Sequence, residues 1–132
     1  MASGPFAAAI NCIDGRTQHA VIEWMVQHAG AKYVDLITEP GPEKMLTQGM
    51  FTQIEDLKRK VKVSVEAHHS QVVALAAHHD CAGNPVSDDE HKAQVQKGAQ
   101  VIAGWGLGVR VVGLWVNDQW QVERVCDIPP TA

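Results

Sequence analysis

Apolar residues gather in short runs along the chain, and the first runs do not alternate with polar residues. Residues 6–13 and 72–77 are apolar and mostly small, a pattern typical of strands that are buried on both faces of a sheet. A further run over residues 33–37 predicts another strand. The segment 38–42 (Thr-Glu-Pro-Gly-Pro) ends that strand, because it can continue neither a helix nor a strand.

Between these runs, apolar residues recur every three or four positions, which is the spacing of a helix that packs one face on a core. Residues 20–28 follow this spacing, and Gly30 suits the positive φ of a helix C-terminus. The sequence Thr-Gln-Ile-Glu at 52–55 is a capping box and predicts the start of a second helix. Ser-Asp-Asp-Glu at 87–90 is another capping box and predicts a third helix, which ends near Ala103.

Residues 109–116 and 120–125 form two further strand-like runs, and the polar pair at 117–118 predicts a tight hairpin turn between them. The alternation of strands and helices along the chain is typical of a parallel sheet with right-handed crossovers. We therefore predict one three-layer α/β domain over residues 1–132. Its mostly parallel sheet has the order 2-1-3-4, with an antiparallel fifth strand beside the fourth and helices on both faces. Ligands bind such sheets beyond the carboxyl ends of the first and third strands.

Composition and charge narrow the class of protein further. Of 132 residues, 45% are hydrophobic and the net charge is −4, which describes a globular chain with no electrostatic reason to bind nucleic acid. No stretch approaches the ~20 apolar residues that cross a bilayer, and the N-terminal residues lack the pattern of a signal peptide. We therefore expect a cytoplasmic protein with no nucleic-acid or membrane partner. Its three cysteines favour free thiols, a metal or a reactive site over disulfides.

Two polar breaks follow the first and third predicted strands, where a ligand crevice is expected. The first break contains Cys12 and Asp14, and the second contains His78 and Cys81. Thiolate and imidazole are preferred ligands of zinc, and three protein ligands leave one tetrahedral position for water, as in catalytic zinc sites. We therefore predict that Cys12, His78 and Cys81 bind Zn²⁺. The third cysteine, Cys126, lies on the last predicted strand and is expected to be a packing residue.

Cys12, Asp14 and Arg16 form the pattern Cys-x-Asp-x-Arg, and His78 and Cys81 form the pattern His-x-x-Cys. In this order and at these strand ends, the two motifs resemble those of the β-class carbonic anhydrases. The resemblance implies a carbonic anhydrase-like domain in which the two cysteines and the histidine hold zinc, and Asp14 and Arg16 act beside it in catalysis. It also implies a lyase that converts carbon dioxide to bicarbonate, assembled as a homodimer or a higher homo-oligomer.

The chemistry of these residue types agrees with the roles that the resemblance implies. Zinc lowers the pKa of bound water toward about 7, so that hydroxide can attack the carbon of carbon dioxide. The Asp14 carboxylate would orient that hydroxide by accepting its hydrogen, and a bidentate pair with Arg16 would keep the carboxylate ionised. Two thiolates neutralise the charge of the metal, so we expect faster turnover at alkaline pH. The sequence leaves open whether Asp14 pairs with Arg16 or coordinates the zinc itself.

Several positions depart from the family pattern and leave further functions open. The chain is shorter than typical members, residues 38–42 differ from the family's segment there, and Ala82 stands in place of a glycine. The glutamine and aromatic residues that line the family's substrate pocket are not found. A hydrolase of carbon disulfide or carbonyl sulfide would use the same metal. The sequence is also compatible with a non-catalytic zinc-binding or sensing module of the same fold, and with thiol redox chemistry between Cys12 and Cys81.

Other polar residues near the two breaks could serve the site or stabilise the structure. His79 and Asp80 flank the predicted ligands and are expected mainly to form hydrogen bonds that stabilise their loop. His19 and His91 each begin a predicted helix, where exposed polar residues are ordinary, although either could carry protons near the crevice. Glu39, at the carboxyl end of the second strand, is a further candidate for the site. The four tryptophans are expected to be packing residues.

Overall fold

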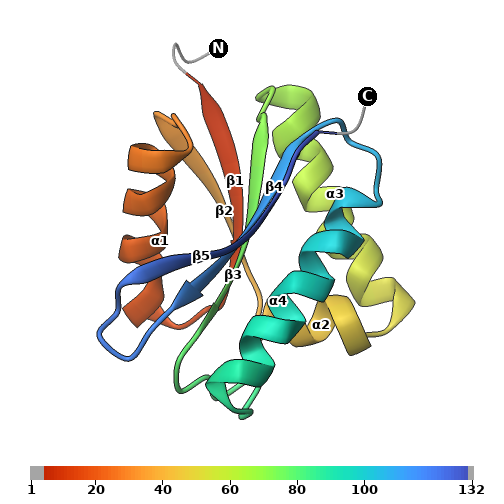
Figure 1. Cartoon of the computed structure of the whole chain (residues 1–132). Helices are drawn as coiled ribbons and strands as arrows, with labels where there is room; N and C mark the ends of the chain where they lie inside the picture. Colours follow the sequence, from red (N-terminus) through yellow and green to blue (C-terminus); the bar gives the residue numbers. More distant parts are fainter. Residues whose placement is uncertain (1–4, 131–132) are drawn as a thin grey trace.

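The computed structural model describes residues 5–130, in which a five-stranded sheet carries helices on both faces (Figure 1). The strands are β1 (Phe6–Asn11), β2 (Tyr33–Thr38), β3 (Val72–His78), β4 (Arg110–Val116) and β5 (Val122–Ile128). The helices are α1 (Gly15–His28), α2 (Pro42–Gln48), α3 (Phe51–Ala67) and α4 (Asp88–Ala103). The strand order is β2-β1-β3-β4-β5, and only β5 runs antiparallel to its neighbour. The predicted fold class is confirmed.

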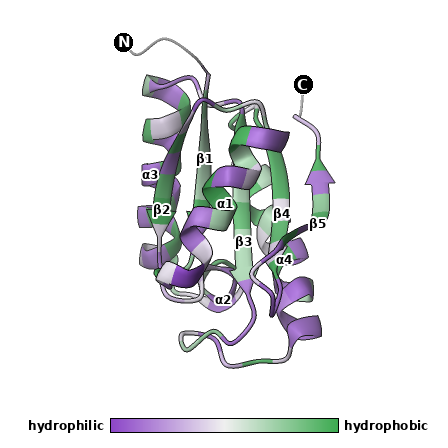
Figure 2. Cartoon of the chain, turned by 90° about the vertical axis from the view of Figure 1, so that its left-hand side faces the viewer, coloured by the Kyte–Doolittle hydropathy of each residue, from purple (hydrophilic) through white to green (hydrophobic). Residues whose placement is uncertain are grey.

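Two hydrophobic layers separate the sheet from its helices. Val21 and Met25 of α1 pack against Ala7 and Ala9 of β1 on one face. On the other face, α2, α3 and α4 cover the sheet, and Leu57 of α3 is fully buried there (Figure 1). In Figure 2, β1, β3 and β4 are hydrophobic along most of their length, whereas the helices carry many hydrophilic residues.

No helix within residues 5–130 is both long enough and apolar enough to cross a membrane.

The first strand ends two residues earlier than its apolar run predicts. Asn11 is the last residue of β1, and its Oδ1 accepts the N–H of Cys12 at 2.9 Å. Asp14 then caps α1 by accepting the N–H of Arg16 at 2.9 Å. Side-chain oxygens thus satisfy the main chain at the end of the strand and at the start of the helix. The break after β1 is a tight turn that leads directly into α1.

The segment after β2 contains a helix that the sequence analysis missed. Residues 38–42 end β2 as predicted, but Pro42 occupies the first turn of α2. Proline suits this position, because its missing N–H is not needed there and its fixed φ matches the helix. Gly41 precedes it with a φ of 57°, in the left-handed region. The new helix packs against β3 and α4, so a helix and not a loop borders the carboxyl end of β3.

One of the two predicted N-cap residues is confirmed, and the other is wrong. Ser87 caps α4 by accepting the N–H of Glu90 at 3.2 Å. The helix predicted to begin at Thr52 has Met50 as its N-cap residue, and Gln53 Oε1 accepts the N–H of Met50 at 3.1 Å. Glutamine three residues after the N-cap residue fills the role of the glutamate in a capping box, two residues earlier than predicted.

The final hairpin turns over more residues than predicted. Asn117 Oδ1 accepts the N–H groups of Gln119 and Gln121, both at 3.0 Å, so the turn spans residues 117–121. Trp120 therefore lies in the turn and not in β5, and its φ of 59° is in the left-handed region. Because this turn follows the carboxyl end of β4, Trp120 lies at the same edge of the sheet as the two polar breaks.

Candidate metal centre

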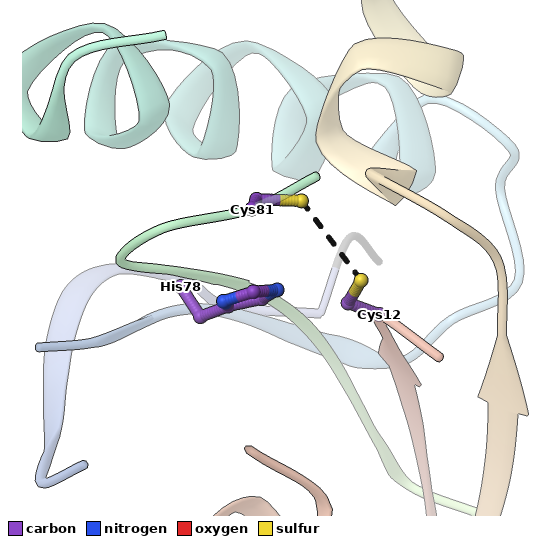
Figure 3. Close-up of side chains that lie close together, drawn as sticks. All are labelled: Cys12, His78 and Cys81. Atoms are coloured by element: carbon purple, nitrogen blue, oxygen red, sulfur yellow. Dashed lines mark hydrogen bonds between the residues drawn. The ribbon is translucent and has the colours of Figure 1, made fainter. Parts of the chain in front are cut away.

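The two polar breaks meet at the carboxyl ends of β1 and β3, which are neighbours in the sheet. Cys12 follows β1, His78 is the last residue of β3, and Cys81 lies in the loop that leads to α4; all three are buried (Figure 3). Their potential ligand atoms lie within 4.8 Å of one another, and the two sulfur atoms are 3.9 Å apart. Two sulfurs bound to one tetrahedral zinc ion at about 2.3 Å would be about 3.8 Å apart. The spacing therefore fits a shared ion.

The hydrogen bonds of His78 leave one of its ring nitrogens available to a metal. Its Nδ1 donates to the main-chain carbonyl of His79 at 2.7 Å, which orients the other edge of the ring toward the two sulfurs (Figure 3). The Nε2 atom is buried and has no hydrogen-bond partner among residues 5–130. A metal ion would satisfy this nitrogen, and a carbonyl on the opposite nitrogen is the usual support for a histidine ligand. Two sulfurs and one imidazole form a donor set that zinc prefers.

The two thiols change each other's ionisation because they are buried and adjacent. A hydrogen bond from Cys81 lowers the pKa of Cys12, and His78 adds to this effect against the opposing influence of burial. The same contact and burial raise the pKa of Cys81, with a contribution from the charge of Glu43. Burial opposes protonation of His78, but the adjacent Cys12 and the hydrogen bond to the His79 carbonyl outweigh this and raise its pKa. The surroundings therefore stabilise a thiolate, which is the form of cysteine that binds metals.

Asp14 and Arg16 lie beside the three potential ligands and bind each other. Arg16 donates from Nε to Asp14 Oδ1 at 3.0 Å and from Nη2 to Asp14 Oδ2 at 2.7 Å. This contact lowers the pKa of Asp14 to about 2, so the carboxylate is ionised at neutral pH. Asp14 Oδ2 lies 3.9 Å from His78 Nε2, which places the carboxylate next to the ligand atoms.

Two further residues hold Arg16 in this position. Asp80 accepts from Arg16 Nη1 through its carboxylate at 3.3 Å and from Nη2 through its main-chain carbonyl at 3.1 Å. The guanidinium carbon lies 4.5 Å from the centre of the Trp120 ring, within the range of a cation–π contact. The same ring lies 6.3 Å from that of His78. No motif distinguishes Trp120 in the sequence, and only the shape of the hairpin turn brings it here.

The side chains of three other candidates pair elsewhere. His79 Nδ1 lies 3.0 Å from Asp88 Oδ1 at the start of α4, which fits the loop-stabilising role expected of it. Glu39 pairs with Lys60 of α3 at 3.7 Å. The side chain of His19 is 95% exposed, on the surface of α1. Within residues 5–130, the hydrogen bonds and ion pairs of these three side chains do not include any of the potential metal ligands.

The expectation that His91 is exposed is wrong. The residue is fully buried, and its Nδ1 lies 2.6 Å from Glu43 Oε2. Helix α2, which the sequence analysis missed, supplies Glu43 and covers this part of α4. The sequence near His91 therefore contains no signal for its burial.

Cys126 is half-buried and lies so close to Gly113 that a Cβ there would meet its sulfur at 2.6 Å. Its role as a packing residue is consistent with this position.

The fold and the site together define an α/β protein with a candidate Cys-His-Cys metal centre at the carboxyl ends of adjacent parallel strands. Comparison with protein families gives a match to the family described as "Putative carbonic anhydrase", over residues 2–126. The chain belongs to this carbonic anhydrase family, and the resemblance inferred from its motifs is confirmed. A comparison with curated proteins found no match.

Solved structures of β-carbonic anhydrases have a similar fold. A structure from a report on two tetrameric β-carbonic anhydrases of the ascomycete Sordaria macrospora matches with a TM-score of 0.65 at 14% identity, covering 99% of this chain and 84% of that one. β-Carbonic anhydrase isoform I of Trichomonas vaginalis matches with a TM-score of 0.63 at 16% identity, covering 99% and 87%. The β-carbonic anhydrase of Aspergillus fumigatus matches with a TM-score of 0.62 at 13% identity, covering 92% and 76%. At these identities the similarity establishes the fold alone.

Proposed function

We propose that this chain is a zinc-dependent, carbonic anhydrase-like lyase that interconverts carbon dioxide and bicarbonate. The main support is the meeting of Cys12, His78 and Cys81, in which a buried His78 Nε2 without a partner among residues 5–130 faces two sulfurs 3.9 Å apart. Membership of the carbonic anhydrase family also supports it. Zinc, when bound, lowers the pKa of water toward about 7 and so supplies a nucleophile for carbon dioxide.

In this proposal Asp14 orients the nucleophile. Its carboxylate is ionised because Arg16 lowers its pKa to about 2, so it can accept a hydrogen bond but cannot donate one. By accepting the hydrogen of the attacking hydroxide, Asp14 would direct the free lone pair toward the carbon of the substrate. Arg16 engages both carboxylate oxygens, which favours this role over coordination of the metal by Asp14.

Arg16 is a positioning residue in the same proposal. Asp80 binds it from the loop that carries Cys81, and Trp120 covers the plane of its guanidinium group. A planar, permanently charged side chain suits this environment better than lysine would, because it binds a carboxylate through two parallel bonds and stacks on an aromatic ring. These contacts would hold Asp14 at a constant distance from the metal ligands.

We propose further that residues 1–132 act as one cytoplasmic domain in a homodimer or higher homo-oligomer. The related Sordaria macrospora enzymes are described as tetrameric. Met50 and Phe51 are large apolar residues that are 66% and 76% exposed, as expected of residues that a second subunit covers. We propose a small-molecule substrate and no nucleic-acid partner, because a chain with a net charge of −4 is not attracted to a phosphate backbone.

Metal analysis combined with stopped-flow hydration of carbon dioxide tests the proposal. Protein purified without chelator should contain stoichiometric zinc and should hydrate carbon dioxide faster at pH 9 than at pH 7, because two thiolates weaken the Lewis acidity of the metal. Stoichiometric zinc with no hydration at either pH would contradict the substrate and leave the metal centre standing. Assays with carbon disulfide and carbonyl sulfide would then test the hydrolase function. Protein that binds no zinc would contradict the whole proposal.

A further inference from the structure

Four polar side chains form a buried cluster next to the loop that carries Cys81. The members are Glu43 of α2, Asn84 of the loop, and His91 and Gln94 of α4; their exposures are 1%, 1%, 0% and 7%. Glu43 Oε2 accepts hydrogen bonds from His91 Nδ1 at 2.6 Å and from Asn84 Nδ2 at 3.1 Å. Asn84 Nδ2 also donates to Gln94 Oε1 at 2.6 Å. We call this group the α2–α4 polar cluster, after the two neighbouring helices that it joins (Figure 1).

The stability of the fold does not by itself account for such a cluster. Burial of a carboxylate and an imidazole carries a desolvation penalty that their mutual attraction often fails to offset, and apolar side chains of similar volume are frequently as stabilising. Glu43 Oε1 and His91 Nε2 also have no hydrogen-bond partner within residues 5–130, which adds to the penalty. The contribution of the cluster to folding stability therefore does not explain its presence, whereas its position beside the loop that carries Cys81 does.

Asn84 connects the cluster to Cys81 through the main chain. The N–H of Asn84 donates to the carbonyl of Cys81 at 3.3 Å, and this bond closes a turn over residues 81–84. The turn lies directly against the start of α2: a Cβ on Gly41 would lie 2.9 Å from Asn84 Cβ, and a Cβ on Gly83 would lie 2.9 Å from the carbonyl carbon of residue 40. The start of α2 thus restrains the main chain of the turn, and the polar cluster restrains the side chain of Asn84.

We propose that the α2–α4 polar cluster positions the metal centre, by holding the turn that carries Cys81 at metal-binding distance from Cys12. The inference rests on the proposed metal centre, but a rigid turn is a consequence that exists without the metal. The sulfur of Cys81 lies 3.9 Å from that of Cys12. Zinc–ligand distances in proteins lie within about 0.2 Å of their standard values, so a loosened turn would weaken binding even with all three ligands present.

Three substitutions in the cluster and one outside it test the proposal, with a conservative variant of Glu43 beside them. Glu43→Leu removes the acceptor of two hydrogen bonds, whereas Glu43→Gln keeps an oxygen acceptor at the same reach without the charge. Asn84→Leu removes the group that joins the turn to both helices, and Gln94→Met is a milder variant for use if the others do not fold. Ser64→Ala is the matched control, because it also removes a buried hydrogen bond, that of 2.6 Å between Ser64 and Ser70. These two residues precede β3, whereas the turn that carries Cys81 follows β3.

Amide hydrogen exchange of the metal-free protein measures whether the cluster holds the turn. In Glu43→Leu and Asn84→Leu, we expect residues 79–84 to exchange at least about tenfold faster than in the wild type, with β1 unchanged. Glu43→Gln should restore most of the protection, and Ser64→Ala should leave this segment as in the wild type. Equal protection of residues 79–84 in the wild type and in the leucine variants would overturn the proposal.

Cobalt(II) binding measures whether the turn positions Cys81 for a metal. Competition with a chromophoric chelator should show about 10- to 100-fold weaker binding in the leucine variants, with a weakened sulfur-to-cobalt charge-transfer band. Affinity in Glu43→Gln and Ser64→Ala should stay close to that of the wild type. Loosening of the turn with unchanged cobalt affinity would overturn the proposal. Wild-type protein that binds no cobalt would contradict the metal centre, and hydrogen exchange alone would then decide whether the cluster holds the turn.

Discussion

Asp14 and Arg16 are separated by one residue, and their side chains form a bidentate pair, with Nε donating to Oδ1 at 3.0 Å and Nη2 donating to Oδ2 at 2.7 Å. Asp14 Oδ1 also accepts the main-chain N–H of Arg16 as the cap of α1. The same carboxylate therefore begins the helix and presents a negative charge beside the potential metal ligands. The pair joins residues two positions apart across the turn between β1 and α1, and Asp80 and Trp120 support it from other parts of the chain.

Asp14→Asn should abolish most carbon dioxide hydration while zinc remains bound. Asparagine caps helices as well as aspartate does, so folding should be preserved. The amide has no charge to hold Arg16 and can present a donor to the nucleophile, so we expect kcat/KM to fall by about 10²-fold or more. Because the pKa of Asp14 is about 2, the loss should be similar at pH 7 and pH 9. Full activity in stopped-flow assays of the zinc-loaded variant would contradict this role.

Cys12→Ser should reduce the zinc content of the purified protein far below stoichiometry, because serine replaces a thiolate with a poor zinc ligand. Cys126→Ser is the control, since Cys126 is half-buried on β5 and packs against Gly113. Elemental analysis of both variants measures the difference. Equal zinc content in the two variants would place the metal elsewhere.

Removal of zinc should expose Cys12 to alkylation. Cys12 has a lowered pKa because Cys81 donates a hydrogen bond to it, whereas burial raises the pKa of Cys126. Near pH 7, iodoacetamide should therefore modify Cys12 before Cys126 in chelator-treated protein, and zinc should suppress the reaction. Peptide mass spectrometry identifies the modified residue. If chelation changes the reactivity of neither Cys12 nor Cys81, both the metal role and the redox role are contradicted.

Gly41→Ala should destabilise the metal-free protein by about 2–5 kcal/mol, the sum of the costs of a left-handed backbone and a crowded site. Gly41 has a φ of 57°, and a Cβ there would lie 2.9 Å from Asn84 Cβ and 3.1 Å from the Gly83 carbonyl oxygen. Gly106→Ala is the control, because Gly106 has a φ of 70° and open space around it, so only the backbone cost of about 1–2 kcal/mol applies. Urea unfolding gives both values, and equal losses would contradict the close packing of α2 on the turn.

Acid should weaken the hairpin of β4 and β5 through the pair of Arg110 and Asp127. Arg110 donates to the two carboxylate oxygens of Asp127 at 2.8 Å each, and this contact lowers the pKa of Asp127. A carboxyl group with a lowered pKa in the folded state contributes stability that is complete above its ordinary pKa and is lost as the pH falls below that value. Between pH 6 and pH 3, the free energy of unfolding should therefore fall less in Arg110→Gln than in the wild type. Identical acid dependence of urea unfolding in the two proteins would contradict the pairing.

The sequence by itself determined the sheet, three of the helices and the candidate metal ligands. Apolar runs without alternation identify strands buried on both faces, and the order of strands and helices limits their arrangement to few topologies. Because that arrangement places the ends of the first and third strands side by side, the potential ligands at Cys12, His78 and Cys81 could be grouped from the sequence. The hydrogen bonds that cap α1 and α4 are also local, since each joins residues within one turn of the chain.

Only the tertiary structure decided the helix α2, the position of Trp120 and the burial of His91. Pro42 ends a strand and begins a helix equally well, and a seven-residue helix is too short to form without the neighbours against which it packs. The partner that buries His91 is Glu43, 48 positions earlier in the chain. Capping and periodicity depend on adjacent residues and can be recognised in a sequence, whereas the burial of a polar side chain depends on distant segments that meet only when the chain folds.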